Sequence, residues 1–384
     1  MQLRKLSSKH RKLLLYRSRR AMQKRSKYKC QKYRKASAET SKSNLATKNR
    51  IPPPPQTASL VSTEMVRGPK RQIWELMEPP GNFSFRNNYH EVGSFLASFR
   101  DKVYNKDYAR RRFGIDFRKL DDITPGAALV LAAELHRLRV FINNVLIPIR
   151  YEEWKRNISA TFNQLGLFEF LKVNENYIED VSKYRSNEVF IKYSLGVDVT
   201  PSDCAELLDH LKEIAGPIDA ENFIYDGLIE AIKNSKQHAY SDQRWYGVEE
   251  GTWLMCGAYN ARSGVLTAAV YDYGVGIPYT LPRSGWWEKV KALLATFDRH
   301  DDAAMIAAAI EVGRSRTGLS ERGKGLPAML RFFDKRPGVL RILSGSGEVR
   351  YSSKRQKIER IDHKVPIGGT LIQWEVYGEK ESEY

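Results

Sequence analysis

The sequence has few cysteines, no long apolar run and, after its first fifty residues, no excess of either charge. Its three cysteines, Cys30, Cys204 and Cys256, are far apart and form no CxxC pair. This argues against a disulfide framework or a zinc site and is typical of a reducing compartment. No apolar run approaches the roughly 18–20 residues that a membrane helix needs, and no secretory signal core is visible. We therefore expect a cytoplasmic protein without a membrane span.

The composition allows packed cores and separates one strongly charged segment from the rest. Hydrophobic residues make up 42% of the 384 residues, and this length accommodates two ordinary domains and a tail. The net charge of +18 belongs mainly to residues 1–50, which contain 18 Lys and Arg but only one acidic residue, Glu39. The other 334 residues carry 45 basic and 44 acidic residues, so the folded part is nearly neutral.

Changes in composition divide the chain into a tail, a linker and two α/β regions. Residues 1–50 form a basic tail, helical or disordered, and residues 51–70 form a linker that contains the stiff spacer IPPPPQT. In residues 71–175, IDFRKLDDITPGAALVLAAELHRLRVF predicts a strand, a turn at Thr124-Pro125-Gly126 and an apolar helix. A strand at 144–149 and a helix at 154–165 follow, which indicates a small α/β domain.

This strand, turn and helix resemble a STAS domain, the small α/β module of anti-sigma-factor antagonists and sulfate transporters. In signalling members of that family a phosphorylatable serine precedes the turn glycine. Here Pro125 holds that position, with Thr124 beside it. The phosphorylation switch of the family is therefore not carried over to this chain.

Residues 176–384 open with a predicted strand at 192–199 and helix at 202–215, followed by a helical segment with polar residues at regular spacing. NFIYDGLIEAIKNSKQHAY has the apolar stripe of an amphipathic helix. Glu230, Asn234 and His238 are four apart, so they lie on one face within about two turns. A carboxylate, an amide and an imidazole so placed can position water, a metal ion and a phosphate. A solvated helix face is the alternative interpretation.

A second segment, AAVYDYGVGIP, places an acidic residue at the end of a predicted strand. The β-rich run from residue 265 ends at Asp272 and is followed by Gly274 and Gly276. A carboxylate there is a hydrogen-bond acceptor at the floor of a pocket, and the glycines let a ligand approach the backbone. An ordinary Asp-Gly turn is the alternative.

Two glycine-rich segments complete the pattern. GRSRTGLSERGKGLPAML runs into an apolar helix from about Leu326, and glycines at a helix N-terminus present free N–H groups to an anion. Its spacing is not that of a P-loop, and a flexible basic loop is the alternative. Gly368-Gly369-Thr370 opens the final predicted strand, LIQWEVY.

In this order and at these separations, the four segments resemble the motifs of the GHKL ATPase superfamily. That superfamily includes type II topoisomerases, a heat-shock chaperone ATPase, mismatch-repair ATPases, and histidine and anti-sigma kinases. The resemblance spans residues 219–384. It implies a Bergerat-fold α/β sandwich with a mixed sheet under helices, ATP and Mg²⁺ as cofactors, and a lid at about residues 278–325.

The resemblance also implies a role for each matched residue. Glu230 matches the general base that orients the attacking water, and Asn234 matches the Mg²⁺ ligand. Asp272 matches the acid that accepts the adenine amino group, and Thr370 matches the threonine that supports it through water. The remaining matches line the adenine pocket or bind phosphate at the end of the lid, and they are Gly274, Gly276, Gly323, Lys324 and Gly325.

Two stretches depart from the family pattern. The lid region between Ile277 and Gly313 contains its own helical pattern and the pair Trp286-Trp287, expected to pack inside the lid or to mark a partner surface. Residues 350–364 are a basic insertion, expected as a solvated loop or hairpin.

Glu230 favours hydrolysis, so we expect a nucleotide-driven conformational switch or regulator. The alternatives are an anti-sigma-type serine/threonine kinase that acts on a STAS domain, with Thr124 or Ser159 as acceptor, and a non-hydrolysing ATP-sensing scaffold. A regulator, a stress or phage-defence component and the ATPase subunit of a larger complex would each suit this arrangement.

The basic tail indicates a nucleic-acid partner. Its cations can neutralise phosphates, and Tyr16, Tyr28 and Tyr33 can stack on bases. Adsorption to a membrane surface and a targeting peptide are the alternatives. A protein partner or a homodimer is also expected.

Overall fold

The structure is a computed structural model that describes residues 65–67, 73–104, 113–142, 146–216, 221–240, 248–314, 329–330, 333 and 336–378. The chain divides into two compact units, Met1–Ala58 and Ser59–Tyr384, and all described residues belong to the second. The basic tail lies outside the described residues. Within the described part of the chain, no helix is both long and apolar enough to cross a bilayer.

The first part of this unit is a parallel α/β region. Its elements are β1 Met65–Arg67, β2 Ile73–Met77, β3 Asn82–Phe83, α2 Tyr89–Tyr104, β4 Phe113–Ile115, β5 Asp122–Ile123, α3 Pro125–Ile142 and β6 Leu146–Pro148. One sheet has the order β1-β2-β4-β6, in which β2, β4 and β6 are parallel and β1 is antiparallel to β2. A small α/β region was predicted here and is confirmed, whereas its likeness to a STAS domain stays a prediction.

The predicted turn at Thr124-Pro125-Gly126 is the N-terminus of α3. Proline is favoured at the first position of a helix, and the Thr124 carbonyl accepts a hydrogen bond from the Ala128 N–H (2.8 Å). A Cβ on Gly126 would overlap the Gln373 side chain and lie 3.1 Å from Leu371. Glycine at this position therefore lets the start of α3 pack closely against the last strand of the chain.

Short helices follow this region and lead into the second sheet. They are η4 Tyr151–Glu153, α4 Arg156–Gln164, α5 Leu167–Leu171 and α6 Glu175–Ser182. The predicted strand at 192–199 is shorter in the structure, β8 Ser194–Gly196, and another short strand, β7 Glu188–Phe190, precedes it. Between them the Ile191 N–H still donates to the Gly257 carbonyl of the neighbouring strand (2.8 Å), whereas the Tyr193 N–H donates to the Leu165 carbonyl at the end of α4 (3.3 Å).

The second sheet has eight strands, and every pairing in it is antiparallel. Its order is β13-β12-β11-β14-β10-β9-β7, with β8 also paired to β9. The remaining strands are β9 Trp253–Asn260, β10 Val265–Asp272, β11 Gly338–Ser344, β12 Gly347–Ser352, β13 Lys357–Asp362 and β14 Thr370–Tyr377. The mixed sheet that the resemblance implied is therefore wrong. Tight turns such as Gly345-Ser346 join antiparallel neighbours, whereas parallel strands need long crossovers.

Helices of this second part pack beside the sheet and beyond its end. They are α7 Pro201–Ala215, α8 Glu221–Asn234, the π-helical turn η5 Ser235–Ala239, α9 Ile277–Thr280, η6 Leu281–Arg283, α10 Trp287–Leu294 and α11 Asp302–Arg314. In the predicted lid, Trp286 and Trp287 pack against a small core around Val290 and Leu294. The basic insertion at 350–364 contains the hairpin strand β13.

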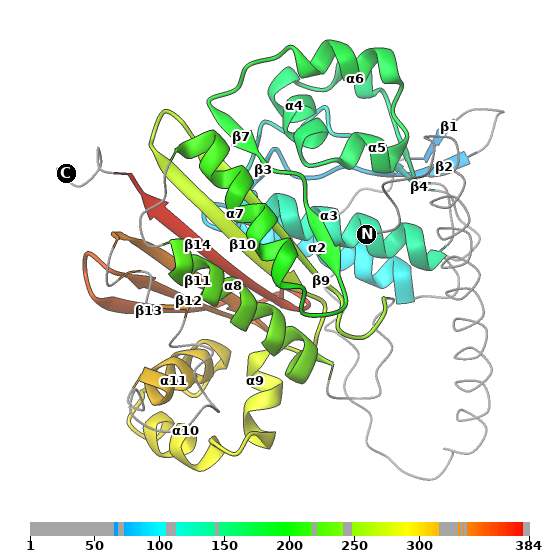
Figure 1. Ribbon diagram of the computed structural model, residues 1–384. Coiled ribbons are helices and arrows are strands. Elements are labelled where there is room, and N and C mark those ends of the chain that lie inside the picture. Colours follow the sequence, from blue (N-terminus) through cyan, green and yellow to red (C-terminus); the bar gives the residue numbers. More distant parts are fainter. Residues whose placement is uncertain are drawn as a thin grey trace, which may run out of the picture. The chain divides into compact units, whose positions relative to one another are not determined.

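Alternation along the strands gives the sheet two buried faces. On β10, Leu266, Ala268 and Val270 join the core of α7, α8 and α11, whereas Ala269 and Tyr271 join the core of α2 and α3. Figure 1 shows α7 and α8 on one side of this sheet and α2 and α3 on the other. The core of α2 and α3 contains residues from before and after residue 175. The N-terminal α/β region therefore packs directly on the back of the C-terminal sheet.

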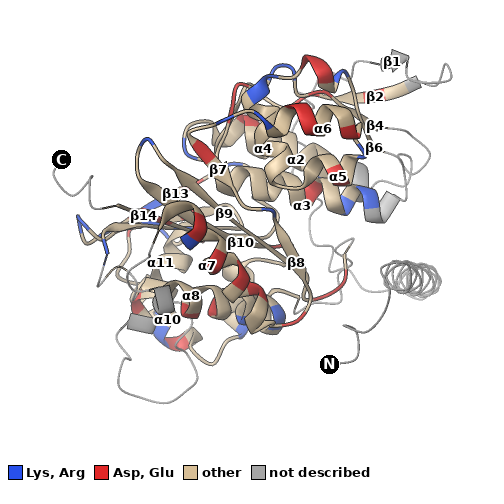
Figure 2. Ribbon diagram, turned by 45° about the horizontal axis from the view of Figure 1, so that its top comes forward, with Lys and Arg blue, Asp and Glu red and all other residues tan. Residues whose placement is uncertain are grey.

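Acidic and basic residues occur along all parts of the described ribbon (Figure 2). This distribution agrees with the near balance of acidic and basic residues after residue 50.

Candidate functional site

Three polar side chains meet at one end of the eight-stranded sheet. Asp272 ends β10, pairs in register with Thr370 of β14, and Thr370 pairs in register with Ser344 of β11. The strand alternation puts all three on the face that carries α8. All three are buried, and the Thr370 and Ser344 hydroxyls lie 2.9 Å apart. The Ser344 hydroxyl also accepts a hydrogen bond from the N–H of Ile277, the first residue of α9 (2.8 Å).

Asp272 is a buried carboxylate that has no ion-pair partner among the described residues. Burial raises its pKa from 3.8 to about 7, and the backbone N–H groups of Gly274 and Thr370 offset part of this rise. One carboxylate oxygen accepts a hydrogen bond from the Gly274 N–H (2.8 Å). A carboxylate held in such surroundings is costly unless a ligand or a proton compensates it, and strongly shifted groups of this kind gather at functional sites.

Helix α8 rests on the same face and ends near these residues. Its residues Ile224, Leu228 and Ile232 are fully buried, and a Cβ on Gly227 would lie 3.1 Å from Trp374 of β14. Asn234 is seven residues after Gly227, so it continues the face that meets β14. The helix therefore directs Asn234 toward the end of the sheet where β14 begins at Thr370.

The π-helical turn η5 docks the end of α8 onto the loop after Asp272. The Val275 N–H donates to the Ala239 carbonyl (2.8 Å), and a Cβ on Gly274 would overlap Ala239. π-helical turns are rare and frequently occur at functional sites. Segments far apart in the chain thus converge, since this turn, the Asp272 loop and the β14 start are in contact.

Two adjacent polar side chains at this helix end have no partner among the residues that the structure describes. The Asn234 side chain is half-buried and has no hydrogen bond within the described part of the chain. Ser235 is 1% exposed, and its hydroxyl also has no partner among the residues that the structure describes. Buried polar groups are nearly always hydrogen-bonded, so a ligand or ordered water is the expected partner.

The other predicted residues of this helical segment, Glu230 and His238, have different surroundings from Asn234 and Ser235. Glu230 lies one turn before Asn234, and its carboxylate forms an ion pair with Lys233 (2.7 Å). His238 is exposed on the π-helical turn. The wider π-helical geometry takes it off the line that regular α-helical spacing would give.

The predicted glycines have a packing role as well as any role toward a ligand. Gly276 has a positive φ of 91°, which favours glycine, and a Cβ there would lie 3.0 Å from the Ser344 hydroxyl. The sequence predicts that the missing side chains of Gly274 and Gly276 leave space for a ligand, whereas Ala239 and Ser344 occupy that space. Gly323, Lys324 and Gly325 lie outside the described residues.

Two cavities lie away from these residues. One of about 380 Å³ lies between α7 and the β7–β8 segment and is lined by residues such as Ile191, Leu207 and His210. The other, of about 230 Å³, is lined by Asp298, Arg299, Asp301, Arg360 and Asp362. No predicted site residue lines either of these two cavities.

A metal ion at the candidate site would depend on few protein ligands. The described residues contain no cluster of three or more His, Cys, Asp or Glu side chains that would hold an ion. The Asn234 amide oxygen is the one predicted ligand, and its lack of a hydrogen bond to any described residue fits that role. An ion held this way takes most of its oxygen ligands from water and from phosphate, as is usual for Mg²⁺.

The sequence did not reveal two residues of this site. Ser344 belongs to it because β11 pairs with β14, and no local pattern specifies that pairing. Ser235 follows Asn234 directly and was overlooked because regular helical spacing does not place it with Glu230 and Asn234.

Comparison of the chain with protein-family models, with curated proteins and with solved structures found no match in any of the three. Any function proposed for the chain therefore depends on the chemistry of its own residues.

Proposed function

We propose that the end of the sheet around Asp272 binds Mg·ATP and that the protein is a nucleotide-driven conformational switch that hydrolyses ATP. One observation carries this proposal. A buried carboxylate with a raised pKa, at Asp272, lies beside the end of a helix whose Asn234 and Ser235 side chains have no partner among the described residues. A hydrogen-bond acceptor and polar groups without a partner among the described residues lie at one end of the sheet. They suit a ligand that carries both a hydrogen-bond donor and a phosphate group.

Each residue has a distinct task in this proposal. The Asp272 carboxylate accepts a hydrogen bond from the exocyclic amine of adenine, which would compensate its buried charge. The Asn234 amide oxygen supplies one ligand to Mg²⁺, and bound Mg²⁺ would neutralise charge on the phosphates. Glu230 orients the attacking water, and the ion pair with Lys233 must loosen or be shared for this to occur.

The kinase alternative is less well supported by the positions of the two acceptors named for it. Ser159 is fully buried, and its hydroxyl lies 3.0 Å from the Tyr177 hydroxyl. Thr124 precedes α3, whose start packs against Gln373 on the sheet face opposite Asp272. Transfer to Thr124 within one molecule would require the phosphate to cross the sheet.

Nucleotide binding by the purified protein, with and without Mg²⁺, tests the proposal. We expect Asp272→Ala to weaken ATP affinity at least about tenfold, because a charge-assisted hydrogen bond contributes about 1.5–3 kcal/mol. Asn234→Ala should abolish the Mg²⁺ dependence of binding. Glu230→Ala should retain ATP and lose phosphate release by about a hundredfold or more, as expected when a general base is removed.

Matched variants separate these effects from general damage. Asn163→Ala removes another half-buried asparagine near a helix end, in α4, and should change neither measurement. A wild-type protein that is indifferent to nucleotide would end the proposal. Phosphate that appears on the protein or on a partner, without release, would favour the kinase, and binding without either outcome would favour the scaffold.

We further propose that residues 1–50 bind nucleic acid through their phosphates. The segment carries 18 Lys and Arg against one acidic residue, and such binding is tolerant of sequence and strongly salt-dependent. A chain that begins at Gln56 should lose nucleic-acid affinity and keep ATP binding. Unchanged nucleic-acid affinity after the truncation would contradict the proposal that residues 1–50 bind nucleic acid.

A further inference from the structure

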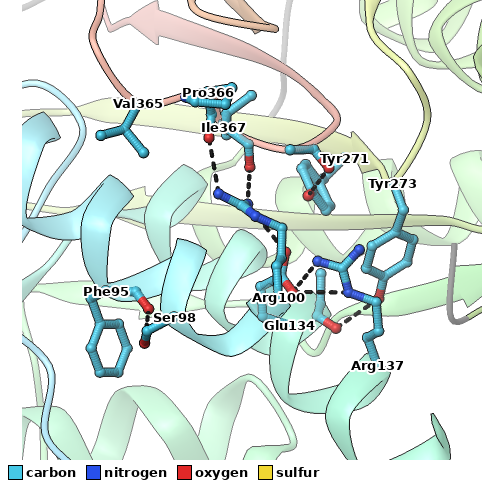
Figure 3. Close-up of polar contacts among 12 residues, drawn as sticks. Phe95, Ser98, Arg100, Glu134, Arg137, Tyr271, Tyr273, Val365, Pro366 and Ile367 are labelled. Atoms are coloured by element: carbon cyan, nitrogen blue, oxygen red, sulfur yellow. Dashed lines mark hydrogen bonds and ion pairs between the residues drawn. The ribbon is translucent and has the colours of Figure 1, made fainter. Parts of the chain in front are cut away.

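A buried charged cluster lies on the opposite face of the sheet, directly behind the candidate site. It consists of Arg100 from α2 and Glu134 and Arg137 from α3, with Tyr271 and Tyr273 of β10 and its following loop above them (Figure 3). Glu134 and Arg137 are 0% and 1% exposed and form an ion pair. Arg100 reaches Glu134 at 3.5 Å. The cluster therefore joins the N-terminal α/β region to the strand that ends in Asp272.

Arg100 holds the chain segment that leads into β14. Its guanidinium donates to the Ile367 carbonyl and to the Pro366 carbonyl, the latter at 2.9 Å. Figure 3 shows the Arg100 side chain between this segment and Glu134. Because the guanidinium fork is planar and its donors are fixed in direction, this contact sets where the chain turns before Thr370.

The two glycines before Thr370 are explained by this arrangement. Gly368 has a positive φ of 84°, and a Cβ on it would overlap the Arg100 guanidinium. A Cβ on Gly369 would overlap the Asp272 carbonyl and lie 3.0 Å from the Tyr271 hydroxyl. The Tyr271 hydroxyl donates to the Gly368 carbonyl (3.3 Å). A continuous set of contacts thus runs from Arg100 through Gly368 and Gly369 to Asp272.

A second set of contacts holds the loop on the other side of Asp272. The Tyr273 hydroxyl donates to the Ala133 carbonyl of α3 (2.7 Å), and the Arg137 guanidinium lies 5.0 Å from the centre of the Tyr273 ring. Tyr271 and Tyr273 therefore anchor both neighbours of Asp272 to the N-terminal region. Their side chains alternate with that of Asp272, which points to the other face.

We propose that Arg100 is a positioning residue for the nucleotide site and that the N-terminal α/β region controls nucleotide affinity through it. Buried ion pairs are frequently no more stabilising than apolar residues of similar size, so stability alone is a weak reason for this cluster. Its contacts instead fix two backbone segments, at Gly368 and at Asp272, to helices α2 and α3. The part of the proposal that concerns affinity rests on the proposed ATP site, whereas the positioning part does not.

Hydrogen exchange of Arg100→Met without nucleotide tests the positioning directly. Three amides report on the site: Ile367, bonded to the Gly345 carbonyl, Gly274, bonded to Asp272, and Val275, bonded to the Ala239 carbonyl. We expect Ile367 to exchange at least about tenfold faster in the variant and Gly274 and Val275 to follow to a smaller extent, since local opening is measured amide by amide. Amides in α7 should be unchanged.

Two further variants keep the test decisive. Arg118→Met removes another arginine of the N-terminal region, which pairs with buried Asp116 at 2.8 Å, and should leave the three amides unchanged. Arg100→Lys keeps the charge beside Glu134 without the fork, and it should show intermediate exchange even if Arg100→Met does not fold. Unchanged exchange at Ile367 in both Arg100 variants, or equal acceleration throughout the chain, would overturn the positioning role.

ATP affinity of the same variants tests the second part. We expect Arg100→Lys to bind ATP at least about fivefold more weakly than wild type and Arg118→Met to bind equally, in line with typical coupling between distant sites. If wild type binds no ATP, the proposed function fails and the exchange result still decides the positioning role. If wild type binds and Arg100→Lys binds equally, the control of affinity by the N-terminal region is wrong.

Discussion

The polar groups on the two faces of strand β10 differ in whether they have partners among the described residues. Tyr271 and Tyr273 face α2 and α3, where each hydroxyl has a carbonyl partner and the charges of Arg137 and Glu134 are paired. Asp272, between them, faces α8, where no cation pairs with it among the described residues and where Asn234 and Ser235 have no partner in that same part of the chain. Adjacent residues of the same strand therefore face two different environments, because successive side chains point to opposite faces of the sheet.

This difference distinguishes a structural polar cluster from a candidate binding site. Groups that are hydrogen-bonded or ion-paired inside the protein fix its conformation, and their removal should cost stability. Groups that are buried without partners cost stability in the free protein, and their removal should have little cost or a benefit. Substitutions on the two faces of β10 test this contrast.

The largest change in stability is expected for Glu134→Leu, on the face of the sheet that packs against α2 and α3. The substitution leaves Arg100 and Arg137 without their carboxylate, and breaking a buried pair in this way costs about 3–5 kcal/mol. Chemical denaturation should report this loss. Glu179→Leu in α6, which removes an exposed carboxylate paired with Lys183, should cost less than about 0.5 kcal/mol. A loss below about 1 kcal/mol in Glu134→Leu would mean that the cluster is not a structural unit.

A gain in stability is expected for Asp272→Asn on the other face. The folded pKa of Asp272 is raised to about 7, so between about pH 4 and pH 7 the folded protein keeps a proton that the unfolded chain releases. This part of the wild-type stability is fully present below pH 4 and is lost as the pH rises through 7. The asparagine variant should therefore be more stable than wild type at pH 8, by on the order of 2 kcal/mol, and by less at pH 5.

The same measurement on Asp116→Asn provides the contrast. Asp116 is also buried but is paired with Arg118 (2.8 Å), so its replacement should destabilise the protein at pH 8. If Asp272→Asn is also less stable than wild type at that pH, the Asp272 carboxylate has a compensating partner and the contrast between the faces is lost.

Local pattern predicted much of the C-terminal region. The strand that ends at Asp272, the strand that begins at Thr370 and the helix that carries Glu230 and Asn234 occur where their periodicities placed them. Such elements have long apolar stripes or clean alternation, which depend on neighbours in sequence. The sequence predicts a turn at Thr124-Pro125-Gly126, whereas α3 already begins at Pro125, because proline is favoured in the first helical turn.

Features that depend on tertiary contacts were not predictable. At the break between β7 and β8 the Tyr193 N–H donates to the Leu165 carbonyl, a contact outside the sheet. The register that joins Asp272, Thr370 and Ser344 depends on strands far apart in the chain. The sequence predicts that Gly368 belongs to a ligand-binding segment. In the structure, the absence of a Cβ at Gly368 leaves room for the guanidinium of Arg100, more than 260 residues earlier in the chain. The mixed sheet was an error of analogy, because the turns at 261–264 and 345–346 already favour antiparallel hairpins.

The smallest effect is expected for Ser235→Ala, which removes a buried hydroxyl that has no partner among the described residues. Its stability should be unchanged or higher by up to about 1 kcal/mol, because an unsatisfied polar group is lost. Ser159→Ala is the matched control, since Ser159 is also a fully buried helical serine but its hydroxyl meets that of Tyr177. That variant should lose about 1 kcal/mol. Thermal denaturation of both variants without nucleotide gives the comparison, and equal losses would show that Ser235 has an internal partner and is not available to a ligand.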